Sequence, residues 1–276
     1  MANTSLRDKK IWITGASSGI GESLAIACAR LGAKVLISAR RESELKRVQA
    51  ICNNLCPNST QLLVLDLTAA ATLKTAVETA HKLLEGIDIL VNNGGIAQRG
   101  LAVNMDIEAE RMMMETNYFS AVALTKYTIP YMQKNGSGVI LIISSIMGEV
   151  GMPYASTYAA SKHALNGYFE SMATELLPHN IRVKIAMPGY VRTNVSINAV
   201  LADGTRHGKM DKGQAKGMPP EVLADKLIHF IGNNKRELIV AGQEGWIVFF
   251  KKYLPFLYYR IASSQYHKVY QKYGNS

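Results

Sequence analysis

The chain has 276 residues, of which 48% are hydrophobic, and its 31 Lys and Arg against 21 Asp and Glu give a formal charge of +10. This composition excludes a disordered, collagenous or fibrous protein and is typical of one globular domain. No stretch approaches the roughly 18 apolar residues of a membrane span, and residues 1–8 have no apolar core for a signal peptide, so we expect a cytoplasmic protein. Cys28, Cys52 and Cys56 lack metal-ligand spacing, so we expect free thiols and no metal site.

The positive charge is concentrated at the C-terminal end. Residues 246–276 contain five basic residues and no acidic one, together with ten of the 21 aromatic residues (6 Phe, 13 Tyr and 2 Trp). Because half of the net charge lies in this one segment, we expect no nucleic-acid partner. The change in composition predicts a domain over residues 1–244 and an aromatic and basic tail over 245–276.

Short apolar runs alternate with segments of helical period between residues 10 and 241. The expected strands are 11–13, 35–37, 62–65, 87–91, 139–143, 181–186 and 238–241. The expected helices are 22–31, 42–55, 68–84, 107–133, 157–177 and 221–230, with a long polar loop at 203–217. Strands that are apolar throughout and alternate with helices are typical of a parallel sheet covered on both faces. We therefore predict a single α/β domain with a doubly wound, seven-stranded parallel sheet of the Rossmann type.

A glycine-rich loop follows the first expected strand directly. It reads Thr14-Gly15-Ala16-Ser17-Ser18-Gly19-Ile20-Gly21, and the first helix starts at once. Gly15 permits a tight turn, Gly19 lets the backbone approach a pyrophosphate, and Gly21 allows close packing of helix on strand. Because free N–H groups at a helix start attract anions, we predict dinucleotide binding rather than a merely flexible loop, with Ser17, Ser18 and Ile20 also in the site.

Four polar residues further along the chain form the candidate catalytic group. Tyr158 and Lys162 are four residues apart and so lie on one face of the expected helix 157–177. Ser145 follows the strand 139–143, thirteen residues before Tyr158, and Asn117 lies within the helix 107–133. A tyrosine with a pKa of about 10 needs a nearby cation to act as an acid or base at neutral pH, and Lys162 supplies that charge.

The order of these motifs resembles the short-chain dehydrogenase/reductase family, over residues 10–241. The family's loop is Thr-Gly-x-x-x-Gly-x-Gly, as here, and Asn92-Asn93-Gly94-Gly95 is similar to its Asn-Asn-Ala-Gly element, with Gly94 where alanine is usual. The resemblance implies that Asp66 and Leu67 contact the adenine and that Asn93 and Gly94 line the cofactor site. The loss of a methyl at Gly94 is expected to leave the backbone contacts possible.

The resemblance also implies roles for the catalytic group. Tyr158 protonates the carbonyl oxygen as hydride arrives from the nicotinamide, Ser145 holds that oxygen, and Lys162 also binds the nicotinamide ribose. Asn117 keeps a water in place for proton replacement. The segment 188–193 is similar to the family's Pro-Gly-x-x-x-Thr element, which contacts the nicotinamide half of the cofactor. The expected contacts there are Pro188, Gly189, Val191 and Thr193.

The residues after the second strand indicate which nicotinamide cofactor is used. The family's enzymes that use NAD carry Asp where this chain has Ala39, and Arg40 and Arg41 follow. Guanidinium groups are suited to a phosphate dianion, so the sequence favours NADP(H). The alternative, in which both arginines are solvated at the start of the next helix, is easier to accept for Arg41 than for Arg40.

We therefore predict an NADP(H)-dependent carbonyl reductase or alcohol dehydrogenase acting on an apolar small molecule, with substrate contacts in residues 98–105, 147–154 and 190–217. Residues 39–41 and 192–196 resemble the dehydrogenase/reductase member 7 branch, whose animal members carry an N-terminal anchor that we do not expect here. The alternatives are a catalytically silent NADP-binding sensor or membrane-surface protein, and a double-bond reductase or dehydratase. The complete group of Asn117, Ser145, Tyr158 and Lys162 argues against both.

Two placements of the tail remain open from the sequence. It can pack on its own domain or on a second subunit of a homodimer or homotetramer, as the resemblance implies. It can also lie on a membrane surface, because aromatic and basic residues suit the lipid interface, whereas the apolar stretch is too short and too charged to span.

Overall fold

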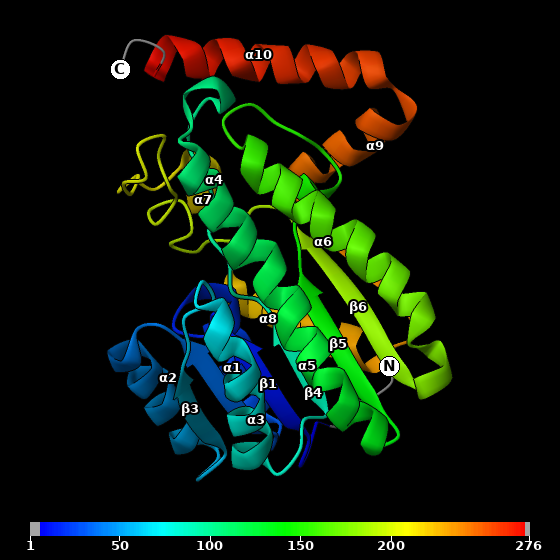
Figure 1. Cartoon of the computed structure of the whole chain (residues 1–276). Helices are drawn as coiled ribbons and strands as arrows, with labels where there is room; N and C mark the ends of the chain where they lie inside the picture. Colours follow the sequence, from blue (N-terminus) through cyan, green and yellow to red (C-terminus); the bar gives the residue numbers. More distant parts are fainter. Residues whose placement is uncertain (1–5, 274–276) are drawn as a thin grey trace.

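The computed structural model describes residues 6–273, and its centre is one seven-stranded parallel sheet (Figure 1). The strands are β1 (Lys10–Thr14), β2 (Lys34–Ala39), β3 (Thr60–Val64), β4 (Ile89–Asn92), β5 (Gly138–Ile143), β6 (Ile181–Pro188) and β7 (Glu237–Val240). Their order in the sheet is β3-β2-β1-β4-β5-β6-β7, and every pairing is parallel. The predicted fold is thereby confirmed. Because the order reverses between β1 and β4, the loops after these strands separate and leave a crevice at their carboxyl ends.

Helices cover both faces of the sheet. They are α1 (Gly19–Arg30), α2 (Glu42–Leu55), α3 (Leu73–Leu84), α4 (Ile107–Met114), α5 (Ser120–Lys134), α6 (Ser156–Glu175), α7 (Lys212–Ala215), α8 (Pro220–Gly232), α9 (Trp246–Tyr253) and α10 (Pro255–Tyr273). One apolar core joins α1, α2 and α8 to one face, and a second joins α3, α5 and α6 to the other. Strand β1 contributes to both cores, since Ile11 and Ile13 lie in the first and Trp12 in the second.

The apolar character of the central strands explains why they are buried on both faces. All six residues of β5 are buried, as are seven of the eight in β6, so neither face of the sheet is left to water at its centre. At 25 cal/mol for each Å² buried, such strands supply much of the free energy of folding. Lys184 in β6 departs from this apolar pattern, because it carries a charge and is only 1% exposed. Its ammonium donates to the carbonyls of Asn233 at 2.9 Å and Lys235 at 2.6 Å and lies 4.5 Å from the ring centre of Phe230.

Most element boundaries differ from those predicted by one to three residues, and the larger differences lie in two helices. The helix expected at 68–84 begins at Leu73, after a short 3-10 turn, and the last strand is shifted by one residue. The helix expected at 107–133 is divided into α4 and α5 by a π-helical turn, η3 (Glu115–Phe119). The tail forms two helices, and α10 crosses the top of the molecule in Figure 1, beyond the carboxyl ends of the strands.

Candidate active site

The glycine-rich loop lies between β1 and α1, beside the crevice. Gly15 and Gly19 have φ values of +66° and +63°, in the left-handed region that favours glycine. A Cβ on Gly15 would lie 2.6 Å from the Cα of Gly94, so glycine lets the loop pack directly on the turn after β4. The N-cap residue of α1, Ser18, makes no side-chain capping bond. The first N–H groups of α1 are therefore left for an anion such as the pyrophosphate of a dinucleotide.

Thr14 and Asn93 join this loop to the turn after β4. The hydroxyl of Thr14 donates to the carbonyl of Val91 at 3.2 Å and accepts from the N–H groups of Asn93 and Gly94, both at 3.1 Å. The side-chain amide of Asn93 donates to the carbonyls of Thr14 at 2.9 Å and Gly15 at 3.1 Å. Asn93 thus acts on the cofactor crevice by holding the glycine loop in place.

The structure gives a physical reason for glycine at position 94. An alanine Cβ at this position would lie much closer to Cδ1 of Leu67 than non-bonded carbon atoms approach. Leu67 follows β3 and packs against the core formed by α3 and α5. Gly94 is therefore matched to the position of Leu67, and an alanine there would displace that side chain.

A basic corner forms where β2 ends. Nη2 of Arg41 donates to the hydroxyls of Ser17 at 3.2 Å and Ser18 at 3.3 Å, which brings its guanidinium over the glycine loop. Burial acts to raise the pKa of Asp66, but hydrogen bonds from Thr68 and the charge of Arg40 bring that pKa below its usual value. The charge of Arg40 therefore acts on the segment after β3, while the guanidinium of Arg41 borders the glycine loop. The structure gives Arg41, which the sequence favoured less, the direct contacts to the loop.

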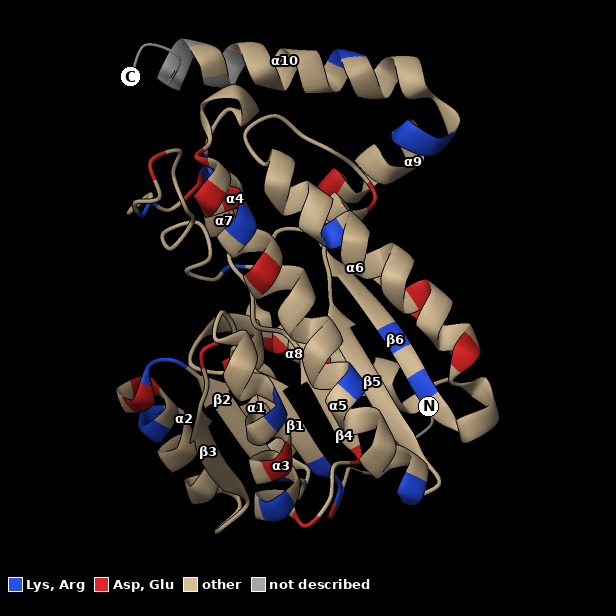
Figure 2. Cartoon of the chain, viewed as in Figure 1, with Lys and Arg blue, Asp and Glu red and all other residues tan. Residues whose placement is uncertain are grey.

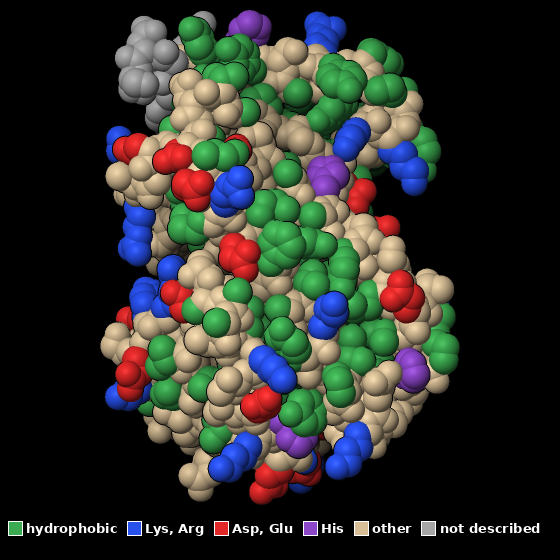
Figure 3. Space-filling model, viewed as in Figure 1, with side chains coloured by type: hydrophobic (Ala, Val, Ile, Leu, Met, Phe, Trp, Pro, Cys, Tyr) green, Lys and Arg blue, Asp and Glu red, His purple; other side chains and the backbone are tan. Residues whose placement is uncertain are grey.

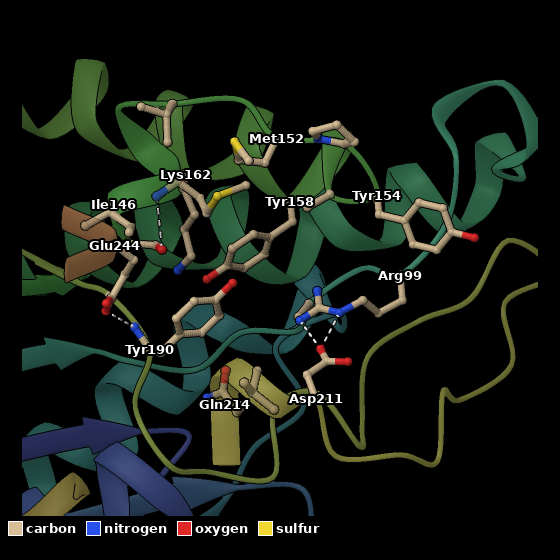
Figure 4. Close-up of a pocket in the computed structure, with 18 of the residues that line it drawn as sticks. Arg99, Ile146, Met152, Tyr154, Tyr158, Lys162, Tyr190, Asp211, Gln214 and Glu244 are labelled. Carbon is tan, nitrogen blue, oxygen red and sulfur yellow. Dashed lines mark hydrogen bonds and ion pairs between the residues drawn. The ribbon is translucent and has the colours of Figure 1, made fainter. Parts of the chain in front are cut away.

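Tyr158 and Lys162 line one cavity (Figure 4), and Ser145 is also part of its lining. Lys162 is 5% exposed; its Nζ donates to the carbonyl of Ile143 at 2.9 Å and lies 5.8 Å from the ring centre of Tyr158. The hydroxyl of Ser145 accepts from the N–H of Met147 at 3.1 Å and donates to the carbonyl of Pro188 at 3.4 Å. The i,i+4 spacing on α6 and the end of β5 thus bring the three side chains together.

Burial shifts the pKa values of Lys162 and Tyr158 in opposite directions. Burial lowers the pKa of Lys162 to about 8, because the ammonium is removed from water. Burial raises the pKa of Tyr158, while a hydrogen bond with Ser145 and the charge of Arg99 act to lower it. A tyrosine so placed stays protonated at neutral pH, and its proton can be given to an acceptor in the cavity.

Asn117 lies in the π-helical turn between α4 and α5. The N–H of Ser120 bonds to the carbonyl of Glu115, five residues earlier, which widens the helix at this point. The amide of Asn117 donates to the carbonyl of Ile96 and to the hydroxyl of Ser161, both at 3.0 Å, and its oxygen accepts from the N–H of Ile96 at 2.8 Å. Its side chain therefore connects the turn after β4 to α6, one residue before Lys162.

Gln98 lies in the loop predicted to contact substrate, and the structure gives it a role that was not predicted, the support of the catalytic helix. It is completely buried, and its Oε1 accepts from the N–H of Thr157 at 2.8 Å and of Tyr158 at 3.2 Å. Its Nε2 donates to the hydroxyl of Ser156 at 3.2 Å. Residue 155, the N-cap of α6, is alanine and cannot cap the helix, so Gln98 provides the acceptor from another loop. A lone glutamine in a loop carries no sequence signal for this role.

The cavity has a volume of about 1030 Å³ and is lined mainly by apolar side chains. The three loops predicted to contact substrate all contribute to it. Within its lining Arg99 and Asp211 form an ion pair (Figure 4), with Nη2 and Nε of the arginine 2.6 and 2.7 Å from Oδ2. This pair joins the 98–105 loop to the 190–217 loop. The helices of the tail also line the cavity, which was not predicted; their residues there are Trp246, Ile247, Phe250, Ile261 and Gln265.

The segment after β6 crosses the crevice from the opposite side. A Cβ on Gly19 would lie 2.8 Å from Cγ2 of Thr193, so Thr193 stands directly over the glycine loop. Nε2 of Gln214 in α7 donates to the carbonyl of Val191 and to the hydroxyl of Thr193, the latter at 3.2 Å. The carboxylate of Glu244 accepts from the N–H of Tyr190 at 2.9 Å and fills the space beside Gly189. The segment is thus held from both α7 and the start of the tail.

A parallel sheet with a glycine loop at its reversal point and a Ser, Tyr and Lys group at a cavity defines an oxidoreductase of the nicotinamide-dependent kind. The family profile described as short chain dehydrogenase matches residues 9–203. The chain belongs to the short-chain dehydrogenase/reductase family, which uses NAD or NADP and small-molecule substrates. Within residues 6–273 no cluster of His, Cys, Asp and Glu is arranged to hold a metal, and no helix is long and apolar enough to cross a membrane.

Relatives with similar sequences include proteins of the member 7 branch of this family. The chain is 38% identical over 259 residues to dehydrogenase/reductase SDR family member 7B of Xenopus laevis, covering 92% of this chain and 80% of that protein. It is 38% identical over 264 residues to the family protein 7-like of Drosophila melanogaster, covering 94% and 81%. A Sinorhizobium meliloti protein solved as a candidate short-chain alcohol dehydrogenase superposes with a TM-score of 0.77 at 25% identity, over 88% of this chain and 98% of that one.

Proposed function

We propose that the protein interconverts a carbonyl and a secondary alcohol on an apolar small molecule, with NADP(H) as the redox partner. The observation that supports this most directly is the convergence of Tyr158, Lys162 and Ser145 on one largely apolar cavity. The site also has room for both a nicotinamide and a substrate, since ligand cavities of about 300–1,000 Å³ are usual.

When bound, the nicotinamide dinucleotide supplies or accepts the hydride. When substrate binds, the hydroxyl of Ser145 turns from its long bond to the carbonyl of Pro188, donates its one hydrogen to the substrate oxygen and places that oxygen beside Tyr158. Tyr158 then gives its proton to that oxygen in reduction and removes it in oxidation. The ammonium of Lys162 stabilises the phenolate that remains, and its N–H groups not used by Ile143 hold the nicotinamide ribose. Asn117 holds the turn at Ile96 against α6. Both of its amide N–H groups are already bonded, so the remaining lone pair of its side-chain oxygen holds the water that returns the proton.

The proposed cofactor contacts follow the crevice from the adenine to the nicotinamide end. They comprise Gly15, Ser17, Ser18, Gly19, Ile20, Gly21, Arg40, Arg41, Asp66, Leu67, Asn93, Gly94, Tyr158, Lys162, Pro188, Gly189, Val191 and Thr193. Among these, the two arginines favour NADPH over NADH, because they border the end of β2, where the adenine ribose of a dinucleotide lies in this fold.

The test is NADPH oxidation against a panel of apolar ketones and aldehydes, followed for the parent chain and for Tyr158→Phe. The variant should bind NADPH as the parent does but turn over at least about a hundredfold more slowly, because general acid catalysis contributes about 10²–10⁴. Tyr168→Phe on the same helix is the matched control, since its ring contacts Tyr118 and Phe169 and does not line the cavity. NADPH binding without turnover of any carbonyl would support a silent binding protein instead.

A further inference from the structure

The two helices of the tail present an unusual outer surface. Seven large aromatic side chains on α9 and α10 are exposed, and we call them the aromatic face: Trp246, Phe249, Tyr253, Phe256, Tyr259, Tyr266 and Tyr270. Trp246 is 61% exposed, and Phe256 and Tyr259 are each 67% exposed. Figure 3 shows hydrophobic side chains gathered over these helices at the top of the molecule. Scattered exposed apolar residues are ordinary, but a continuous set of this kind marks an interaction surface.

Helical geometry places the aromatic residues of α10 on one side. Phe256, Tyr259, Tyr266 and Tyr270 follow the three- and four-residue spacing of a single helix face. The opposite face is attached to the domain. Tyr258 on that side is 7% exposed and donates its hydroxyl to the carbonyl of Gly151. Self-packing therefore accounts for the inner face of the tail and leaves the aromatic face without a partner among the described residues.

The charged side chains on the two helices themselves have one sign. Residues 246–276 contain no Asp or Glu, and Figure 2 shows only basic charges on α9 and α10. The ammonium of Lys252 is exposed and lies 5.6 Å from the ring centre of Tyr253, and Arg260 is exposed beside Tyr259. Lys251 is directed elsewhere, since its Nζ donates to the carbonyl of Glu149 at 2.6 Å. Free cations among tyrosine and tryptophan rings suit the boundary between lipid headgroups and acyl chains.

We propose that the aromatic face docks on the surface of an anionic phospholipid bilayer. The helices lie in the interface, because neither is long and apolar enough to cross it. A second copy of the chain is a poorer occupant for this face. A two-fold interface would set the same basic, acid-free surfaces against each other, and like charges would then repel without compensation. An anionic bilayer instead supplies the opposite charge.

Docking in this way has a consequence for the proposed reaction, and this step rests on the proposed function. Trp246 belongs both to the aromatic face and to the lining of the cavity, and Ile247, Phe250 and Ile261 line the cavity from the same two helices. The wall of the cavity therefore reaches the docking surface. A substrate that partitions into the bilayer, such as a long-chain or polycyclic carbonyl, would enter the cavity directly from the lipid.

The test is sedimentation of the full chain with vesicles of phosphatidylcholine alone or mixed with phosphatidylserine, at low and high salt. We expect co-sedimentation with the mixed vesicles that weakens as salt rises, because screening reduces the attraction of the basic residues. Phe256→Ser with Tyr259→Ser should weaken binding by at least about tenfold, because two interfacial rings are lost. Lys252→Gln with Arg260→Gln should remove the preference for phosphatidylserine.

Matched controls sit on α5, away from the tail. Tyr127 is 40% exposed and Lys126 and Lys134 are exposed, so Tyr127→Ser and Lys126→Gln with Lys134→Gln make equivalent changes elsewhere and should bind as the parent does. Parent protein that stays in the supernatant with mixed vesicles at low salt would overturn the proposal. So would tail variants that bind like the parent, or that change the oligomeric state in analytical ultracentrifugation, since the face would then contact a second copy.

The same variants separate this inference from the proposed reaction. Phe256 and Tyr259 do not line the cavity, so their substitution should leave turnover of a water-soluble ketone unchanged in the absence of vesicles. A chain that binds vesicles but reduces no carbonyl would contradict the proposed function and leave the docking surface standing. A chain that reduces soluble ketones but ignores vesicles would contradict only the docking surface.

Discussion

The support that Gln98 gives to α6 can be tested by replacing it with methionine. Gln98→Met keeps the side chain long and unbranched, so it opens no large cavity, but it removes the acceptor that serves the N–H groups of Thr157 and Tyr158. These are the second and third residues of α6, whose N–H groups need a partner outside the helix. Because Gln98 is fully buried, water cannot easily take the place of its oxygen.

The expected loss follows from these contacts. A buried N–H left without a partner costs about 1–3 kcal/mol, and removal of an ordinary N-cap costs about 0.5–2 kcal/mol. The bond to Thr157 is short at 2.8 Å and that to Tyr158 is longer at 3.2 Å, so the second counts for less. We expect the free energy of unfolding to fall by about 2–4 kcal/mol. Turnover should fall as well, because Tyr158 is held partly by this bond.

Urea unfolding followed by circular dichroism measures the change in free energy. Gln61→Met is the matched control, since Gln61 is an exposed glutamine that also bonds to a carbonyl, that of Leu83 at 3.0 Å. Its effect should stay within about 0.5 kcal/mol, as for most surface substitutions. If Gln98→Met were no more destabilising than this control, the reasoning about the cap of α6 would be wrong.

Two further predictions concern the cofactor and pH. Arg40→Ala and Arg41→Ala should each raise the dissociation constant of NADPH about tenfold or more and that of NADH far less, because a hydrogen bond to a charged group is worth about 1.5–3 kcal/mol. Lys46→Ala on α2 is the control, and calorimetric titration measures the dissociation constants. Equal losses of affinity for both cofactors would show that the arginines have a structural role instead. Burial lowers the pKa of Lys162 and of Lys184 to about 8, below the ordinary value of 10.5. Between those values the unfolded chain binds more protons than the folded one, so the free energy of unfolding should rise from pH 8 to pH 10.5. Lys184→Met should flatten that rise, and a stability that falls over this range in urea titrations would contradict the sign.

The sheet could be predicted from sequence because its strands are apolar on both faces. Runs such as 139–143 and 181–186 contain little that could face water, and their alternation with helices leaves few other folds. The π-helical turn at Asn117 could not be predicted in this way. One extra residue in a helix of nearly thirty changes the hydrophobic period too little to be seen, and its effect depends on contacts with Ile96 and Ser161.

Local motifs predicted where the candidate site would form, but not how it is supported. Tyr158 and Lys162 share a helix face whatever surrounds them, so their pairing follows from spacing alone. Gln98 and Glu244 bond to backbone groups brought near by the fold, and no spacing in the sequence marks such partners. The position of the tail could not be predicted for the same reason. Its amphipathic pattern distinguishes an inner from an outer face but does not indicate that the inner face lines the cavity.

The π-helical turn also constrains which changes in chain length the protein can accept. Deletion of one residue from 115–119 would restore a regular α-helix from α4 into α5 and would satisfy its backbone more simply. It would also rotate α4 by about 100° relative to α5. Met113 and Ala109 would then leave the small apolar cluster that they form with Val200, which belongs to the 190–217 loop that lines the cavity. The more regular helix would thus disrupt the packing behind the cavity wall. We therefore expect residues 115–119 to tolerate substitutions more readily than the deletion or insertion of a residue.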